Sequence, residues 1–317
     1  MTPMNKTKHA LWGLISALLL LVAGNAQTYA ALLVPAAFGD ALYVANRIQT
    51  DAIVRLTPDG IGSFFASAGS DAGHLAFDTA GNLYVANAFP NTIAKITPSG
   101  VRSIFADNLD GLNSPSGLAF DSAGNLYTTT GDTILKFTPG GVGSLFADSS
   151  DGLNHPQGLA FDIAGNLYAT NTTSTIVKLT PGGVGSLFAD SGDGLISPYG
   201  LAFDSAGNLY TSNNPGQIVK LTPGGVGSIF AAAFAPAESL AFDSAGNLYV
   251  ATLGNRTIQK FTPAGVGSVF ADSGDGLGSP IGLAFGRPGP VPEPASAMLL
   301  FGSGAMLLLR RRRAVTR

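Results

Sequence analysis

The sequence predicts an all-β fold, a six-bladed β-propeller, from three observations. First, the segment Gly117–Tyr127 (Gly-Leu-Ala-Phe-Asp-Ser-Ala-Gly-Asn-Leu-Tyr) recurs with few changes, and six tyrosines mark its repeats: Tyr43, Tyr84, Tyr127, Tyr168, Tyr210 and Tyr249. Second, each repeat holds four short apolar runs without helical periodicity. Third, turns containing Gly or Pro separate these runs. Four antiparallel strands in a period of about 40 residues are typical of a propeller blade.

Alternating apolar residues mark four strands in each repeat, named a to d in chain order. In the third repeat they are expected at Leu118–Asp121, Asn125–Thr129, Thr133–Thr138 and Val142–Ala147. The a–b turn offers an Asp side chain as an acceptor for its own backbone and a Gly that can adopt positive φ. The c–d turn, Thr-Pro-Gly-Gly, is expected to be of type II. Tight turns of this kind join antiparallel neighbours, so each repeat should be one antiparallel sheet.

The array is out of phase with the repeat. It begins with a b strand at Leu42 and ends with an a strand at Ile281–Phe285. We expect this last strand to pair with the first blade and close the ring, which would remove the exposed ends of a linear array. A β-solenoid is the alternative, but its coils are shorter and do not need two tight hairpins per repeat.

Composition narrows the classes of partner. The 317 residues include no cysteine, which excludes disulfides and thiolate metal sites. Between Ala31 and Pro290 there are 10 basic and 19 acidic residues. An acidic body argues against nucleic-acid binding and against electrostatic docking on anionic lipid.

The two ends of the sequence carry targeting features. Residues 1–30 are expected to be a signal peptide, with Lys6 and Lys8 before the apolar run Leu11–Ala23. An uncleaved membrane anchor is the alternative. The propeller is expected over residues 31–285, followed by a Pro-rich linker at 286–294 and by an apolar helix with an Arg-rich tail at 295–317. Arginines after an apolar helix would place this end in the cytoplasm and the propeller outside.

Candidate binding residues come from the connectors. In a propeller the b–c and d–a connectors share one face, here called the loop face, and the a–b and c–d turns share the other, the turn face. The turns are nearly uniform, whereas the b–c loops differ, which indicates either a recognition surface or neutral drift. The residue two positions before the strand-a leucine also varies, and we expect these six to surround the mouth of the central channel: Gly73, Ser116, Gln157, Tyr199, Glu238 and Ile281.

Two places in the sequence could hold a metal ion. His74 and His155 fall in the same ring as Glu238, and two histidines with a glutamate could hold a metal. Four d–a connectors carry two aspartates three residues apart, which could bind calcium or could form turns with their own backbone: Asp107/Asp110, Asp148/Asp151, Asp190/Asp193 and Asp272/Asp275. The spacing lacks the further ligands of a calcium loop, which favours turns. No nucleophile–base–acid order or phosphate-binding loop is present, which weighs against an enzyme.

The C-terminal pattern resembles a PEP-CTERM sorting signal. It consists of Val291-Pro292-Glu293-Pro294, a short apolar stretch, and the cluster Arg310, Arg311, Arg312, Arg313. The resemblance implies passage through the secretion machinery and cleavage near Pro-Glu-Pro by an exosortase-type protease. Until that step the inner membrane would hold the chain through its C-terminal helix. The processed protein would then reach the cell surface or the medium of a bacterium that makes exopolysaccharide.

The repeats themselves are similar to NHL repeats, on residues Pro156–Asp162, Gly165–Tyr168 and Ile176–Gly182. This resemblance implies a propeller used mainly for binding. Related propellers include calcium-dependent lactonases and streptogramin lyases, whose ligand residues have no one-to-one match here. The sequence therefore predicts an exported propeller that binds a glycan or an envelope protein. The alternative is a metal-dependent, lactonase-like hydrolase or lyase at the channel mouth.

Overall fold

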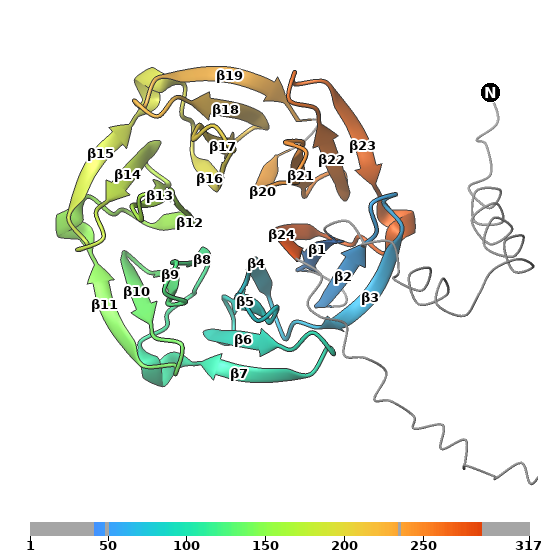
Figure 1. Cartoon of the computed structure of the whole chain (residues 1–317), viewed down its shortest axis with the longest axis horizontal. Coiled ribbons are helices and arrows are strands. Elements are labelled where there is room, and N and C mark those ends of the chain that lie inside the picture. Colours follow the sequence, from blue (N-terminus) through green and yellow to red (C-terminus); the bar gives the residue numbers. More distant parts are fainter. Residues whose placement is uncertain (1–40, 48–50, 234–235, 287–317) are drawn as a thin grey trace, which may run out of the picture. The chain divides into compact units, whose positions relative to one another are not determined.

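A ring of six four-stranded antiparallel sheets forms the body of the protein (Figure 1). The computed structural model describes residues 41–47, 51–233 and 236–286. The six-bladed β-propeller is therefore confirmed. The expected signal peptide at 1–30, the linker and the apolar helix at 295–317 lie outside the described residues. Within the described ranges, no helix is long and apolar enough to cross a membrane.

Strands a and b form the inner half of each blade. The a strands lie nearest the central axis (Figure 1) and are, from blade one to blade six, β24 (Pro280–Gly286), β4 (Ala72–Phe77), β8 (Leu118–Phe120), β12 (Pro156–Phe161), β16 (Pro198–Phe203) and β20 (Ala237–Phe242). The b strands follow them and are β1 (Ala41–Asn46), β5 (Leu83–Asn87), β9 (Leu126–Thr130), β13 (Leu167–Asn171), β17 (Leu209–Asn213) and β21 (Leu248–Thr252).

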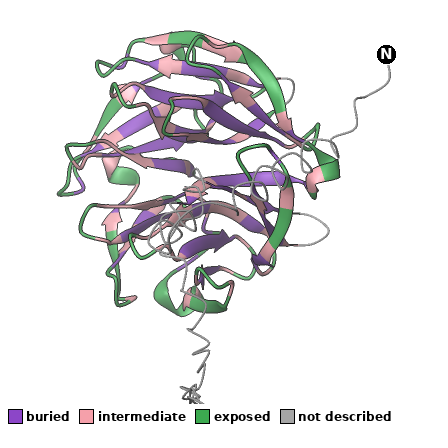
Figure 2. Cartoon of the chain, turned by 45° about the vertical axis from the view of Figure 1, so that its right-hand side comes forward, coloured by how far each residue is buried: buried purple, intermediate pink, exposed green. Residues whose placement is uncertain are grey.

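Strands c and d form the outer half. The c strands are β2 (Ala52–Leu56), β6 (Thr92–Ile96), β10 (Thr133–Phe137), β14 (Thr175–Leu179), β18 (Gln217–Leu221) and β22 (Thr257–Phe261). The d strands run along the perimeter and are β3 (Gly62–Ser67), β7 (Arg102–Ala106), β11 (Gly143–Ala147), β15 (Gly185–Ala189), β19 (Gly227–Ala232) and β23 (Gly267–Ala271). Burial follows this order, because the b strands are almost wholly buried whereas the d strands and the turns are exposed (Figure 2).

The last strand closes the ring, as the phase of the array predicted. β24 pairs antiparallel with β1, with Leu42 opposite Phe285 and Val44 opposite Leu283. Blade one is therefore built from both ends of the repeat region. The seam hides the edges that an open array would expose to other chains.

Each interface between blades contains the same aromatic trio. The tyrosine of strand b stands edge-on between the phenylalanine of its own strand d and the phenylalanine of the next blade's strand a, as in Tyr127 with Phe146 at 4.8 Å and Phe161 at 5.0 Å between ring centroids. The seam repeats this arrangement, because Tyr249 contacts Phe270 at 4.9 Å and Phe285 of β24 at 5.1 Å. Edge-to-face pairs add roughly 0.5–1.5 kcal/mol each to the apolar burial.

The recurring Asp-x-Ala-Gly-Asn turn fixes the tyrosine from the turn face. In blade three, Asp121 accepts hydrogen bonds from the backbone of Ala123 and Asn125, from the Asn125 amide at 2.7 Å and from the Tyr127 hydroxyl at 3.2 Å. Lys136 lies over the Tyr127 ring at 5.4 Å. The recurring Asp-x-Ala-Gly-Asn motif thus stabilises the interface between blades.

The expectation of a type II c–d turn is wrong. Gly141, not Gly140, adopts positive φ, at 85°, and its N–H bonds to the Thr138 carbonyl at 2.9 Å. A type II turn would need positive φ one residue earlier. The turn is instead a type I turn followed by a left-handed glycine, a common three-residue hairpin connection. The third turn position is consequently free, which explains why blade six carries Ala264 there.

Candidate functional site

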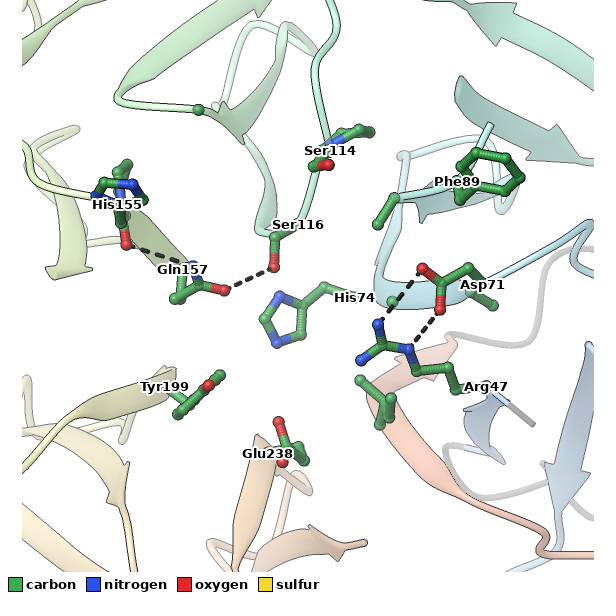
Figure 3. Close-up of a pocket in the computed structure, with 17 residues that line it drawn as sticks. Arg47, Asp71, His74, Phe89, Ser114, Ser116, His155, Gln157, Tyr199 and Glu238 are labelled. Carbon is green, nitrogen blue, oxygen red and sulfur yellow. Dashed lines mark hydrogen bonds and ion pairs between the residues drawn. The ribbon is translucent and has the colours of Figure 1, made fainter. Parts of the chain in front are cut away.

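A pocket of about 420 Å³ opens at the centre of the loop face (Figure 3). All six variable positions before the strand-a leucines line it, together with His74 and His155. These residues come from different blades, and the ring alone brings them together. The structure thus gathers every channel-mouth candidate of the sequence around one cavity, while their role in binding stays a prediction.

Hydrogen bonds between neighbouring blades hold the loops around this pocket. The residue before strand c offers a side-chain oxygen to the backbone N–H of a residue in the following d–a connector. The bonds are Ser114 to Asn91 at 2.7 Å, His155 to Asp132 at 2.8 Å, Ser197 to Ser174 at 3.0 Å and Asp71 to Asp51 at 3.2 Å. The b–c loops that vary in sequence are therefore tied to the pocket rim.

His74 forms the floor of the pocket. Its imidazole lies in the central channel (Figure 3) and also lines a smaller cavity of about 100 Å³ below, where the inner-strand leucines meet. Four other blades have a glycine at this position, such as Gly158, whose added Cβ would overlap the carbonyl oxygen of Tyr199 in the next blade. The remaining blade, blade six, has Ser239 at this position.

Burial and the ring's backbone set the charge state of His74. Burial lowers the pKa of His74, and hydrogen bonds with the backbone of Glu238 and Ser116 counteract this only in part. Glu238 lies in blade six and Ser116 in blade three, so the imidazole spans the channel. The imidazole is consequently neutral at neutral pH and can accept a proton.

The carboxyl of Glu238 faces the same cavity, and an ion pair lies on the neighbouring wall formed by blades one and two. Burial raises the pKa of Glu238, while the charge of Arg47 lowers it to a lesser extent. Arg47 itself is engaged by Asp71 through an ion pair that joins its Nε to Oδ1 and, at 3.4 Å, its Nη2 to Oδ2. Both titratable groups at the pocket centre are thus shifted towards their neutral forms.

Polar groups without charge complete one side. Gln157 donates to the His155 carbonyl at 3.3 Å and lies 3.4 Å from the Ser116 hydroxyl, which donates to its Oε1. Tyr199 projects towards the cavity from β16 (Figure 3). The His155 ring is exposed and bonds to the Asp132 carboxylate at 3.1 Å on the rim. His155 therefore belongs to the rim and not to the centre.

The calcium candidates have a different position and a clear local role. Each aspartate pair caps a short 3₁₀ turn: η1 (Asn108–Asp110), η2 (Ser149–Asp151), η3 (Ser191–Asp193) and η4 (Ser273–Asp275). In η2 the Asp148 side chain accepts from the Ser150 N–H at 2.8 Å, and the Asp151 side chain accepts from the Asp148 N–H at 3.2 Å. The η3 pair, Asp190 and Asp193, repeats these bonds. Across residues 41–47, 51–233 and 236–286, no three His, Asp or Glu side chains gather as metal ligands would.

Among the further lining residues that the sequence did not single out as site residues are Arg47, Asp71, Phe89 and Ser114. Arg47 and Phe89 belong to the b–c loops, whose variation was the available signal. Asp71 and Ser114 stand at the same place in two d–a connectors, with positive φ of 55° and 50°. Nothing in a single sequence marks such a backbone conformation in a residue other than glycine.

Comparison with known proteins addresses the tail and the ring separately. Residues 290–313 match the PEP-CTERM protein-sorting motif. Such a motif implies an exported protein of the cell envelope that exosortase-type machinery processes. Among curated proteins, no sequence matches the chain significantly.

Solved structures of several kinds of protein are similar to this chain in fold. A chain of a nidogen–laminin complex matches with a TM-score of 0.68 and 21% identity, over 77% of this chain and 97% of the other. A streptogramin B lyase gives 0.59 and 16%, over 80% and 89%, and a gluconolactonase from Xanthomonas campestris gives 0.55 and 21%, over 67% and 79%. At these identities the likeness concerns the fold alone. The chain is therefore a six-bladed propeller with NHL-like repeats that carries a PEP-CTERM sorting motif.

Proposed function

We propose that the exported ring is a binding protein of the cell envelope, and that its mouth pocket takes the end of a neutral or amino-sugar chain. One observation carries this proposal. In a ring of near-identical blades, the side chains that differ most between blades converge on a single cavity of about 420 Å³. A concave site with a few convergent polar groups is the usual form of a small-ligand site.

The lining suits a sugar. Tyr199 offers an aromatic face, and the Gln157 amide and Ser116 hydroxyl offer both donors and acceptors within the same wall. Aromatic faces also attract cationic groups such as a sugar amine. An anionic sugar would be repelled, because the described ring holds 18 acidic and 9 basic residues.

The sorting motif supports the same assignment. We infer that the chain is held at the inner membrane through residues 295–309 until processing, and that the ring is then displayed at the surface or released. A glycan ligand would connect this protein to exopolysaccharide or biofilm material. An envelope protein is the other candidate ligand.

Titration calorimetry with glucosamine oligosaccharides and matched uronic-acid oligosaccharides tests the proposal. We expect the amino sugars to bind and the uronic acids not to bind. Tyr199→Ala and Glu238→Gln should each weaken binding about tenfold or more, or about 1.4 kcal/mol. Thr172→Ala, an exposed loop-face position outside the pocket, is the matched control. Binding that survives both pocket substitutions would show that the sugar binds elsewhere.

Acid–base chemistry at the same pocket is the second candidate, favoured by one observation. Burial raises the pKa of Glu238 and lowers that of His74, which brings the two pKa values closer together, as an acid–base pair requires. A lactone panel tests it, because hydrolysis lost in His74→Gln with sugar binding retained would identify a reaction. Absence of turnover on every lactone would leave binding as the function.

A further inference from the structure

The turn face carries exposed apolar side chains in every blade. The residue that follows each c–d turn is valine or isoleucine and is 57–69% exposed: Ile61, Val101, Val142, Val184, Val226 and Val266. The turn proline three positions earlier is also exposed in all six blades: Pro58, Pro98, Pro139, Pro181, Pro223 and Pro263. Ile163, in the a–b turn of blade four, is fully exposed. Single exposed apolar residues are ordinary, but one apolar position repeated around a whole face is not.

The charged residues in and beside the turns balance one another. The turns and the turn-facing lysine positions hold six acidic and six basic residues: Asp59, Asp78, Asp121, Asp162, Asp204, Asp243, and Arg55, Lys95, Lys136, Lys178, Lys220, Lys260. Several form pairs, such as Lys260 with Asp243 at 3.8 Å. The turn face is therefore close to neutral.

The remaining charges of the described residues belong to the loop face and to the d–a connectors. The 3₁₀ turns of these connectors reach the start of the next blade's strand d, where the Gly185 N–H donates to Asp151 Oδ1 and the Gly227 N–H to Asp193 Oδ1, both at 3.4 Å. They are twelve acidic residues, Asp51, Asp71, Asp107, Asp110, Asp132, Asp148, Asp151, Asp190, Asp193, Asp272, Asp275 and Glu238, and three arginines, Arg47, Arg102 and Arg256. Arg102 is counted here because its Nε donates to the Ala68 carbonyl of a d–a connector at 3.1 Å. The acidic excess thus lies in these loops and connectors, and not in the turns that carry the exposed valines.

The chain leaves the ring on the turn face. β24 runs from the loop face to the turn face and ends at Gly286, beside the rings of Tyr43 and Phe77, and Phe77 leads directly into an a–b turn. In the sequence, a Pro-rich stretch and the uncharged run 295–309 follow within nine residues. An extended Pro-rich stretch of nine residues spans at most about 28 Å.

We propose that, before the tail is processed, the turn face rests on a lipid surface, with its valines, isoleucine and prolines at headgroup level and the pocket facing away. The apolar run attached at that face brings the bilayer to it. The charges of the turns cancel, so an anionic lipid surface does not repel the turns. This inference rests on the sorting motif and is independent of the sugar-binding proposal.

Single-cysteine labelling tests this orientation, because the chain has no cysteine of its own. Val184→Cys on the turn face and Thr173→Cys on the loop face are each labelled with bimane in the full chain. Both are reconstituted in phosphatidylethanolamine–phosphatidylglycerol vesicles that contain a lipid with a nitroxide on its headgroup. We expect a blue shift and strong quenching at position 184, and neither at position 173.

A second variant separates face contact from simple tethering. Val142→Ser, Val226→Ser and Val266→Ser, added to the Val184→Cys chain, should weaken quenching at position 184 about twofold or more, because the apolar contact is reduced. These residues are exposed, so the melting temperature should not change. Equal quenching at both labels, or stronger quenching at position 173, would overturn the proposal. A blue shift at position 184 without vesicles that grows with protein concentration would do so too, and would assign the face to contacts between copies.

Discussion

The two faces of the ring handle backbone strain in opposite ways. On the turn face, every described residue with positive φ is a glycine, for example Gly124, Gly141 and Gly183. On the loop face, eight positions with positive φ hold other residues: Asp51, Asp71, Asn91, Ser114, His155, Ser174, Ser197 and Arg256. A left-handed conformation costs such a residue roughly 1–2 kcal/mol. Three of these positions, Asp71, Ser114 and His155, line the pocket, and strain of this kind clusters at functional sites.

This difference separates scaffold from site. The turn face repeats one low-strain solution, in which Asp, Gly and Tyr serve the blade interface. The loop face keeps costly conformations because side chains there reach across to the next blade, as Asn91 does to Ser114. Stability and variation are thus assigned to opposite sides of one ring.

The largest expected loss of stability comes from replacing a turn-face glycine. If that glycine can be replaced without loss, the contrast between the two faces is wrong. Gly183→Ala should destabilise the ring by about 3 kcal/mol or more, because φ is 88° and the added Cβ would overlap the Phe146 carbonyl oxygen. Its neighbour supplies the control, since the Cβ of Gly182→Ala meets nothing closer than the Thr180 Oγ1 at 3.9 Å. Urea unfolding measures both. Equal losses in the two variants would contradict the turn assignment.

The second largest effect is on the dependence of stability on pH. Burial raises the pKa of Asp162, but hydrogen bonds from Asn166, Ala164 and Tyr168 outweigh burial and hold that pKa below its ordinary value. The stabilisation is therefore complete above the unfolded-state pKa and is lost as pH falls through the lower folded-state pKa. Asp162→Asn should cost about 1.5–3 kcal/mol at neutral pH and much less in strong acid.

A loop-face carboxyl gives the matched control for that variant. Asp132→Asn keeps an oxygen for the His155 N–H and removes only an exposed charge, so its cost should stay within about 0.5 kcal/mol. Urea titrations at neutral and acid pH compare the two variants. A cost for Asp162→Asn that does not shrink in acid would show that geometry, and not ionisation, carries the stabilisation.

The smallest effect has the opposite sign. Arg256→Gly should stabilise the ring by up to about 1 kcal/mol, because relief of a φ of 54° exceeds the entropy that glycine adds to the unfolded chain. Blade five already has Gly216 at this position. Ser174→Gly should gain less, since its hydroxyl accepts the Ser197 N–H at 3.0 Å. Thermal melting decides the sign, and a loss in Arg256→Gly would show that the loop face is not strained there.

The sequence predicts most of the scaffold because each blade repeats its own local rules. Alternation places the strands within one residue of the observed bounds in blade three, and the phase of the array predicts the pairing of Leu42 with Phe285. The c–d turn type was missed because two adjacent glycines leave the positive φ unassigned until its hydrogen bonds are known.

The sequence alone predicts the pocket only in part. A position that varies against a constant background, such as Glu238, is visible in one sequence. Three features of the pocket depend on distances between blades. They are the ion pair of Arg47 with Asp71, the lowered pKa of His74 and the position of the His74 ring in the channel. Ring closure sets those distances, and local pattern does not encode them.

The seam in blade one also sets an order of events. The strand that completes this blade is separated from its partner β1 by all the other blades, so the circle cannot exist until almost the whole repeat region is available. If export runs from the N-terminus, as an N-terminal signal requires, the chain crosses as an unfinished string of blades. Final assembly then happens on the far side, a few residues before the sorting tail follows. The sorting motif would thus reach the far side of the membrane only after the whole repeat region has crossed.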